Sequence, residues 1–301
     1  MQDPRHNPMH APTPAKESWR RPIEIIVLMV IAFAIVVIFR NEIRVRWWGY
    51  RLAQTSDVQD RMQYLSLLSS MDVKSLPVAR TLIKDTDPAN RSFGVALLST
   101  INGDEADRLL EVACIDNDKT IRQSAILGLS MRATANTVYR LAGLIKQLDA
   151  DSAMFAVSRL AGINRPESLA ELTRIARSHP EAGVRAQAIE SLGQWGGDDV
   201  VGPLIDCLSD DAVYSGLTAT EAQAHDALAS MAPQFAVSDK PGSDSSKSEN
   251  TGAAKDTNGM RAARKLRDIT GQSFGYLDAD AAERTLAIAR WRSWFESKSG
   301  E

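Results

Sequence analysis

The sequence predicts an all-α protein in which a single transmembrane helix precedes a right-handed α-solenoid of about five to six short helix pairs. Three observations lead to this prediction. A set of residue types recurs every 30 to 32 residues between residues 57 and 233. Residues 23–39 form a run that is apolar at every position but one. Finally, the 301 residues include only two cysteines, which excludes a disulfide-bonded scaffold and a four-cysteine zinc site.

The apolar run lies inside residues 22–40, which we expect to form the transmembrane helix. A spanning helix needs about 17–25 apolar residues, so the run is at the short end of that range. Arginines and aromatic residues flank it on both sides, and such side chains settle at the level of the lipid headgroups. The flanking residues are Trp19, Arg20 and Arg21 before it, and Arg40, Arg44, Arg46, Trp47, Trp48 and Tyr50 after it. The long segment before the run and the Arg40-Asn41-Glu42 sequence after it argue against a cleaved signal peptide.

The segments around this helix predict its setting. Residues 1–21 hold four prolines and are expected to be an extended, mobile tail, whereas residues 41–56 are expected to form a basic, aromatic juxtamembrane helix. The cations on the two sides of the run are nearly balanced. We therefore expect a single-pass protein of the bacterial inner (cytoplasmic) membrane, with a slight preference for a soluble domain that faces the cytoplasm.

The recurring pattern starts with an acidic residue in each of five copies. The five starts are Asp57, Asp87, Asp118, Asp149 and Glu181. Four positions later an arginine follows in four of the copies, and these are Arg61, Arg91, Arg122 and Arg185. A mostly small residue stands seven positions after the start, an aliphatic residue eight and a leucine eleven, so the three share one face of a helix. The acidic start can cap that helix, and a second amphipathic segment in each copy completes a helix pair.

Residues 118–129 (DKTIRQSAILGL) and 183–193 (GVRAQAIESLG) carry a family resemblance most clearly. They resemble the HEAT-like family, whose pattern has an acidic start, then Val-Arg, then alanine, then Ala-Leu-Gly. The closest pattern is its short bacterial form, the phycobilisome-lyase-type repeat, in a bacterial membrane-anchored HEAT repeat protein. The pattern covers residues 57–233, about 60% of the chain, and implies an α-solenoid rather than an activity. The fourth copy departs from it at Ala153, and a possible sixth copy at residues 224–228 follows an insertion.

The repeated acidic residues and arginines are expected to form a structural ladder. Each arginine can pack its stem between helices and pair with the acidic start of its own or the next repeat. A stripe that binds anions is the alternative, but residues 52–233 have a net charge of −8, which opposes a phosphate ligand. The predicted ladder residues are Asp57, Arg61, Asp87, Arg91, Asp118, Arg122, Glu181 and Arg185.

The chain after the repeats divides into a linker and a helical end. Residues 234–259 are rich in serine, glycine and charged residues and are expected to be a disordered linker. Residues 260–297 predict two short helices, which either cap the end of the solenoid or recognise a partner. In the second case Trp291 and Trp294 are the possible partner contacts, because tryptophan is favoured at binding hot spots.

No arrangement of residues in the sequence predicts catalysis, so we expect a protein that is not an enzyme. The four histidines are far from the two cysteines in sequence and do not recur with glutamates, so we predict no catalytic residue, no cofactor and no metal site. The acidic repeats and a net charge of −3 argue against a nucleic acid partner.

These observations together predict a membrane-anchored HEAT-like repeat scaffold. It would contact the membrane through residues 23–39 and bind protein partners through the solenoid surface. The partners are expected to present a basic surface to the acidic repeats. The alternative, which the phycobilisome-lyase resemblance implies, is a small-molecule-binding, bilin-binding or lyase-like protein that uses the concave face.

Overall fold

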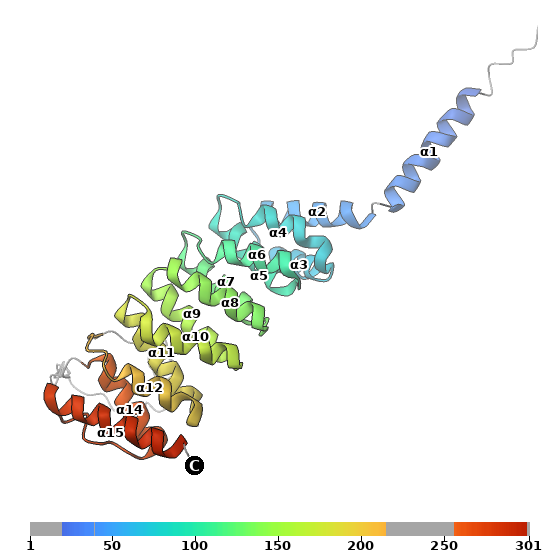
Figure 1. Cartoon of the computed structure of the whole chain (residues 1–301). Coiled ribbons are helices and arrows are strands. Elements are labelled where there is room, and N and C mark those ends of the chain that lie inside the picture. Colours follow the sequence, from blue (N-terminus) through green and yellow to red (C-terminus); the bar gives the residue numbers. More distant parts are fainter. Residues whose placement is uncertain (1–19, 39, 215–255, 300–301) are drawn as a thin grey trace, which may run out of the picture. The chain divides into compact units, whose positions relative to one another are not determined.

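The computed structural model of the protein describes residues 20–38, 40–214 and 256–299 (Figure 1). The regular elements of these residues are helices, apart from one isolated β-bridge between Val213 and Thr257. The chain divides into two units, residues 1–74 and residues 75–301. The predicted all-α class is therefore confirmed for the part of the chain that the structure describes.

The first unit contains α1 (Arg20–Ile38), α2 (Arg40–Gln54) and α3 (Val58–Ser69). Helices α2 and α3 pack together, and the buried residues of this unit include Val45 and Leu52 of α2 and Leu68 of α3. Among the described residues, no single helix has the length and apolar character needed to cross a membrane. Residues 24–35 and 40–54 meet that test only as a pair, with an angle of 65° between them. The predicted segment 22–40 includes Phe39, which lies outside the described residues.

The second unit contains a stack of short helices. They are α4 (Leu76–Leu82), α5 (Pro88–Thr100), α6 (Asp104–Ala113), α7 (Lys119–Ser130), α8 (Ala135–Leu144), α9 (Ala150–Gly162), α10 (Pro166–Ser178), α11 (Ala182–Trp195), α12 (Val201–Cys207), α14 (Asn258–Thr270) and α15 (Ala281–Ser299). Three short 3-10 helices accompany them: η1 (Asp72–Ser75), η2 (Ile145–Gln147) and η3 (Asp198–Val200).

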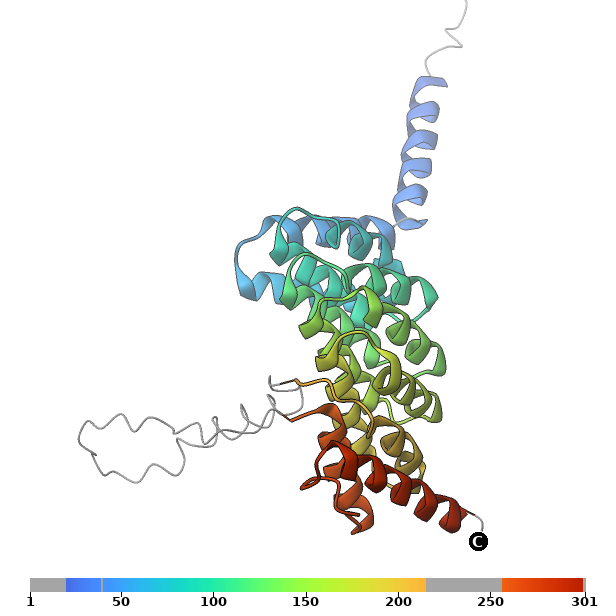
Figure 2. The ribbon, with the colours of Figure 1, turned by 60° about the vertical axis from the view of Figure 1, so that its left-hand side comes forward.

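These helices stack as pairs in two layers (Figures 1 and 2). Helices α5, α7, α9, α11 and α14 pack side by side and form what we call the first layer. Helices α6, α8, α10, α12 and α15 form the second layer, in which neighbours are joined by packing or by ion pairs. Because each pair contacts mainly the pairs before and after it, the unit has the architecture of an α-solenoid.

The predicted repeat registers form the core of this stack. The aliphatic and leucine positions of the repeats in the second unit are fully buried: Val95, Ile126, Val157 and Ile189, and Leu98, Leu129, Leu160 and Leu192. The small residue before them lets the neighbouring helix approach closely. At Gly94, for example, a Cβ atom would lie only 2.8 Å from the Ile83 side chain. The spacing read from the sequence therefore places the buried faces of α5, α7, α9 and α11 correctly.

The described chain resumes at residue 256, and residues 215–255 lie outside it. Helix α14 packs against α11 and α12, in the position of the next first-layer helix, and α15 follows α12 in the second layer. The predicted sixth copy at residues 224–228 lies outside the described residues. The predicted linker extends to residue 259, whereas α14 begins at Asn258, because the Thr257 side chain caps the helix by accepting a hydrogen bond from the Met260 N–H.

Candidate interaction surface

The acidic starts lie at the N-termini of the first helix of each repeat. The side chains of Asp57, Asp87, Asp118 and Asp149 accept hydrogen bonds from backbone N–H groups two or three residues later. Glu181 stands at the same place, but its side chain makes no capping hydrogen bond with the described residues. The shorter aspartate side chain reaches the exposed amide groups of the first turn, and this accounts for the recurrence of aspartate at the start.

Two of the repeat arginines join consecutive repeats through a bidentate pair. Arg91 donates to Asp116 from Nε at 2.8 Å and from Nη2 at 3.0 Å. Arg185 donates to Asp210 in the same way, at 2.7 and 3.0 Å. In both, Nη1 also donates to the backbone carbonyls five and six residues earlier. Each guanidinium therefore closes the loop before its own helix and holds the loop of the next repeat.

The partner of Arg91 stands two residues before the next acidic start, Asp118. Asp210, the partner of Arg185, precedes no predicted acidic start. We predicted the start itself, and this geometry occurs at Arg122, whose Nη2 lies 2.9 Å from Asp149 Oδ2. Arg61, in the first unit, donates to the Thr55 carbonyl at 2.6 Å. The sequence feature that indicates Asp116 as the partner of Arg91 is the segment Asp116-Asn117-Asp118, in which an aspartate stands two residues before the start. Asp116 Oδ1 also accepts the Asp118 N–H at 2.9 Å.

The environment of Asp116 and Asp210 favours the charged carboxylate. Burial is the largest single effect and raises their pKa values, but the hydrogen bonds from Arg91 and Arg185, together with further hydrogen bonds and the arginine charges, outweigh it. The pKa of each aspartate therefore lies below its ordinary value. Both pairs stay ionised at neutral pH and hold the repeats together as charge-assisted hydrogen bonds.

The fourth repeat lacks the arginine, and its partner position changes with it. Ala153 takes the place of the arginine and is buried. His179 occupies the position that Asp116 has in its repeat, and its Nδ1 accepts the Glu181 N–H at 3.2 Å. Its Nε2 is buried and has no hydrogen-bond partner among the described residues. The neutral imidazole thus keeps the loop hydrogen bond without burying a carboxylate that has no arginine to pair with.

Ala153→Arg and His179→Asp, made together, are expected to rebuild the pair of the neighbouring repeats. Each single change leaves a mostly buried charge without its partner and is expected to lower the free energy of unfolding by about 3 kcal/mol. The double variant should recover part of the loss, with a favourable coupling energy of about 1–3 kcal/mol. Urea unfolding of the four proteins measures this coupling. Strictly additive losses would contradict the correspondence between His179 and the aspartate position.

His179 also predicts a loss of stability in mild acid. Burial is the main cause that lowers the pKa of His179, and the charges of Arg185 and Arg174 add to it. Glu181 acts in the opposite direction, but the net shift is downward. The unfolded chain binds a proton at this site below about pH 6.5, whereas the folded chain resists it. Stability should therefore fall as the pH drops below that value, by at most about 1.4 kcal/mol per pH unit from this group. Thermal midpoints of wild type and His179→Asn, compared between about pH 7 and 5, should show a flatter profile for the variant. Equal slopes would show that the histidine does not titrate with folding.

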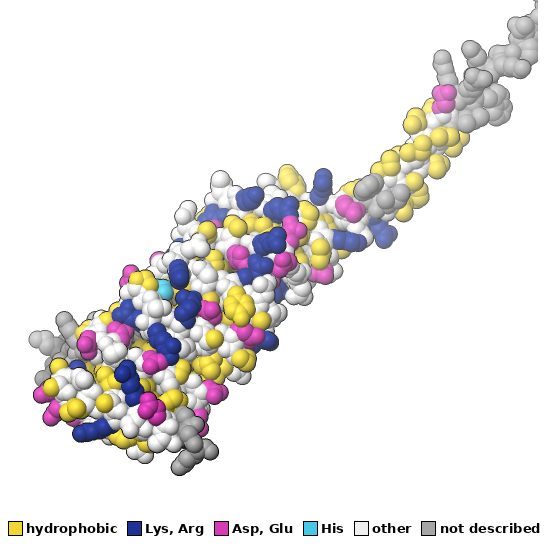
Figure 3. All heavy atoms as spheres, viewed as in Figure 1, with side chains coloured by type: hydrophobic (Ala, Val, Ile, Leu, Met, Phe, Trp, Pro, Cys, Tyr) yellow, Lys and Arg dark blue, Asp and Glu magenta, His cyan; other side chains and the backbone are white. Residues whose placement is uncertain are grey.

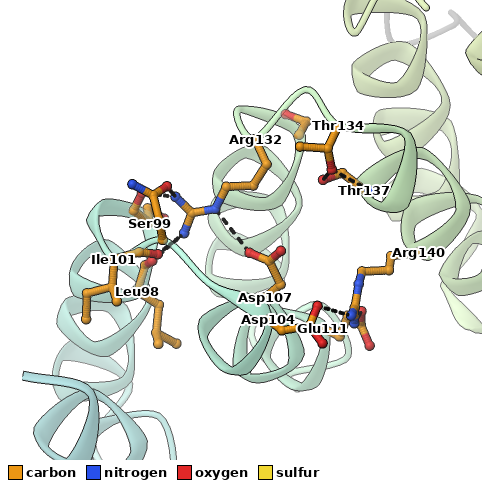
Figure 4. Close-up of polar contacts among 12 residues, drawn as sticks. Leu98, Ser99, Ile101, Asp104, Asp107, Glu111, Arg132, Thr134, Thr137 and Arg140 are labelled. Atoms are coloured by element: carbon orange, nitrogen blue, oxygen red, sulfur yellow. Dashed lines mark hydrogen bonds and ion pairs between the residues drawn. The ribbon is translucent and has the colours of Figure 1, made fainter. Parts of the chain in front are cut away.

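A further arginine, Arg132, joins two repeats at the end of a first-layer helix (Figure 4). It follows α7, and Figure 4 shows it directed at the C-terminal end of α5. Its Nη2 donates to the Leu98 carbonyl at 2.7 Å and also to the Ile101 carbonyl, while Nη1 donates to the Ser99 carbonyl at 3.1 Å. Its Nε pairs with Asp107 at 3.1 Å. Arg132 therefore supplies donors to the Ser99 and Ile101 carbonyls at the end of α5, and a second donor to the Leu98 carbonyl, which also accepts the Ile101 N–H.

The second layer carries its own ion pairs beside exposed apolar residues. Arg140 of α8 pairs with Glu111 of α6, and its Nη2 lies 2.9 Å from Asp104 Oδ1 (Figure 4). Val112 follows Glu111 in the sequence, and Tyr139 precedes Arg140. Their exposed fractions are 56% and 57%. Figure 3 shows that basic and acidic side chains alternate with apolar ones over the visible face of the stack. The second layer thus offers a polar surface with exposed apolar positions on helices that ion pairs hold in place.

The start of α14 is bound to Asp210, the aspartate that pairs with Arg185. Asn258 Nδ2 donates to Asp210 Oδ2 at 2.8 Å and to the Ala182 carbonyl at 3.2 Å. The Gly259 N–H donates to the Asp210 carbonyl at 2.8 Å. A Cβ atom at Gly259 would lie 2.4 Å from the Leu208 carbonyl oxygen, so glycine is required for this close approach. Asp210 therefore binds Arg185 of the preceding repeat and α14 at the same time.

A mostly buried ion pair holds the middle of α14 against α11. Lys265 Nζ lies 2.6 Å from Glu190 Oε2, and Arg261 Nη1 lies 3.7 Å from Glu190 Oε1. The stem of Lys265 passes over Gly193, where a Cβ atom would lie 2.4 Å from Lys265 Cδ. The sequence pattern did not single out Glu190, because a single glutamate on a helix usually faces solvent.

The two predicted partner contacts lie in one aromatic cluster. Trp291 has 0% exposed surface, and its ring centroid lies 4.7 Å from that of Phe274 and 5.7 Å from that of Trp294. Trp294 is partly exposed at the edge of the cluster. Tyr276, also buried, donates a hydrogen bond to the Leu208 carbonyl of the preceding repeat. The structure therefore places Trp291 in the packing of the helical end and Trp294 at its margin, and a partner contact there stays a prediction.

A comparison with protein families bears on this architecture. The family model of HEAT repeats matches residues 140–224, which begin in α8 and run past α12. The chain carries HEAT-like repeats. HEAT repeats commonly serve as scaffolds for protein interactions, and the stacked helix pairs described above have that architecture. The match is to HEAT repeats in general, so the phycobilisome-lyase subtype stays a prediction. No curated protein in the comparison matches the chain.

The side-chain interactions described on the helix stack are packing and ion pairing. Among the described residues, no three His, Cys, Asp or Glu side chains converge as a metal ion would need. Cys114 and Cys207 are buried, and burial raises the pKa of each thiol to about 12. Neither thiol is therefore a nucleophile at neutral pH.

Proposed function

We propose that the protein is a membrane-tethered, non-enzymatic scaffold whose second layer binds a protein partner with a basic surface. The observation that carries this proposal is the pair of exposed apolar residues Val112 and Tyr139, beside the ion pair of Arg140 and Glu111 on neighbouring HEAT helices. Because ion pairs already hold these helices, a partner would bind a preformed surface and lose little entropy in ordering it. Exposed tyrosines on such surfaces are frequent hot spots.

The charge of the repeats supports a basic partner. Residues 52–233 have a net charge of −8. The first turn of α6 alone carries Asp104 and Glu105, whose side chains are 61% and 53% exposed. Charge of this sign attracts a basic surface and speeds its association, and added salt screens the attraction. We therefore expect the complex to weaken as the salt concentration rises.

Photo-crosslinking in the cells that make the protein tests the proposed surface. A photoreactive residue at position 139 of the full chain is expected to capture a protein partner. Leu127 is the matched control, because it is also exposed but lies on α7 in the first layer. Capture at position 139 that exceeds capture at position 127, and that falls with added salt, supports the proposal. Equal capture at the two positions, or none at position 139, contradicts it.

The tether is proposed to be the apolar run of residues 23–39. The described side chains of residues 24–35 are exposed and include a succession of large aliphatic residues, which water solvates poorly. We expect the full chain to stay with membranes after extraction with alkaline carbonate. Val30→Arg places a charge at the middle of the run, which costs about 2.5–3.5 kcal/mol in a bilayer, and should shift protein to the soluble fraction. Val30→Leu is the matched control. Wild-type protein in the carbonate-soluble fraction would contradict the tether.

A further inference from the structure

Helix α2 has two faces with different environments. Val45, Gly49 and Leu52 are buried and share one side of the helix. On the opposite side, Ile43, Trp47 and Tyr50 have exposed fractions of 51%, 54% and 63%. The spacing of four and three residues places these three side chains on one stripe of the helix. A short helix with one apolar face in the core therefore presents a second apolar face outward.

Cations border this outward stripe. Arg40, Arg44 and Arg46 are exposed, and none of them forms an ion pair with the described residues. At 100° per residue, Arg46 lies on one side of the stripe and Arg40 and Arg44 on the other. Glu42 is the one acidic residue of the helix. The outward face of α2 thus combines an apolar centre with a positively charged border, a combination that fits an anionic lipid surface.

The stripe is held in place by contacts inside the first unit. The Trp47 ring makes an edge-on contact with the Tyr64 ring of α3, with centroids 6.1 Å apart. Arg51 lies over the Trp47 ring, 6.0 Å from its centroid, and donates from Nε to Tyr64 Oη at 3.3 Å. These contacts orient Trp47 while more than half of its surface stays exposed. Its orientation is therefore set before any contact with a lipid or a protein.

We propose that α2 lies on the surface of an anionic bilayer, with Ile43, Trp47 and Tyr50 among the headgroups and Arg40, Arg44 and Arg46 bound to lipid phosphates. This inference rests on the proposed tether, since residues 24–35 lead directly into α2. The axis of α2 is turned by 65° from that of residues 24–35. If those residues cross the membrane near its normal, α2 is closer to the membrane plane than to the normal. Indole and phenol rings favour that level of a bilayer, and arginines bind phosphate there.

Spin labelling of the full chain in vesicles tests this placement. The label is attached to the new thiol of Tyr50→Cys. The native Cys114 and Cys207 are not expected to react, because both are buried and burial raises their pKa values to about 12. The control label is at Met131→Cys, on a residue of the second unit that is 70% exposed. Vesicles of phosphatidylcholine, with and without phosphatidylglycerol, are floated, and the label is then probed with oxygen and with a water-soluble nickel chelate.

In floated vesicles that contain phosphatidylglycerol, the label at position 50 is expected to be more accessible to oxygen and less accessible to nickel than the label at position 131. Replacing Arg40, Arg44 and Arg46 together with glutamine should reverse this difference while the protein still floats. If the protein floats and the label at position 50 is as accessible to nickel as the label at position 131, the inference is overturned and the tether stays intact. Protection from both probes would also overturn it, because a protein partner or a second copy would then cover the face. Protein that fails to float would overturn the tether and the inference together.

Discussion

Replacing Arg132 with methionine is expected to lower the free energy of unfolding by about 3–5 kcal/mol. The Arg132 and Asp107 side chains are only 11% and 13% exposed, so methionine would leave the carboxylate without a counter-ion in a site that water scarcely reaches. The Ser99 and Ile101 carbonyls would lose the Arg132 donor at the same time, and the Leu98 carbonyl would keep the Ile101 N–H. Methionine keeps most of the side-chain length, so the loss measures the polar contacts rather than a cavity.

Arg108→Ala is the matched control for this prediction. Arg108 also pairs with an aspartate, Asp104, at 3.2 Å, but the two side chains are 69% and 61% exposed. An exposed pair one turn apart on a helix contributes about 0.3–0.5 kcal/mol, so the control should unfold close to wild type. Urea unfolding of the full chain, followed by circular dichroism, compares the three proteins. Equal losses in the two variants would show that Arg132 does not close the end of α5.

The buried faces of the HEAT helices were predictable because their cause is periodic. A small residue, an aliphatic residue and a leucine at fixed spacing must share one side of a helix, and burial then follows from the hydrophobic effect. The same argument placed the helix caps, since an aspartate before an amphipathic run satisfies the first free amides. It also extends to α14, where Ala262, Ala263 and Leu266 repeat the spacing of Ala188, Ile189 and Leu192 and are buried in the same way.

The contacts between repeats were only partly predictable because they depend on loop geometry. The recurring arginines indicated a ladder, yet the partner of Arg91 is Asp116, two residues before the predicted start. The direction of Arg132 depends on the next residue, Ala133, whose φ of 51° is in the left-handed region. Alanine seldom adopts that conformation, so nothing in the local sequence announces the turn. Side chains that act through such turns are found only when the backbone path is known.

The docking of the helical end could not be predicted from the sequence either, because it also depends on the path of the backbone. Asn258 and Gly259 lie in a stretch whose composition resembles a linker, and their role appears only when residues far apart in the sequence meet. Asn258 bonds to Ala182, 76 residues earlier, and Gly259 lies against Leu208. No periodic signal links positions with such a separation. The helix pair α14–α15 therefore continues the stack across an interruption that sequence spacing alone does not bridge.

Replacing Trp291 with alanine is the second change with a large expected effect, a loss of about 3–5 kcal/mol in unfolding free energy. The ring is fully buried against Phe274 and Trp294, so its removal leaves a cavity and takes the central member from the cluster. Because α15 packs on α12, we expect the loss to appear first as faster hydrogen exchange in residues 258–299. Leu286→Ala, at a position 59% exposed on the same helix, is the control and should change stability by less than about 0.5 kcal/mol.

This comparison also separates the two roles that the sequence left open for the helical end. A tryptophan that packs the end of the solenoid contributes to stability whether or not a partner is present. A tryptophan that recognises a partner from an exposed position contributes to binding and little to stability. Loss of stability in Trp291→Ala, with normal stability in Leu286→Ala, assigns Trp291 to packing. Unchanged stability in Trp291→Ala, together with lost capture of a partner, would assign it to recognition and contradict the packing that its burial indicates.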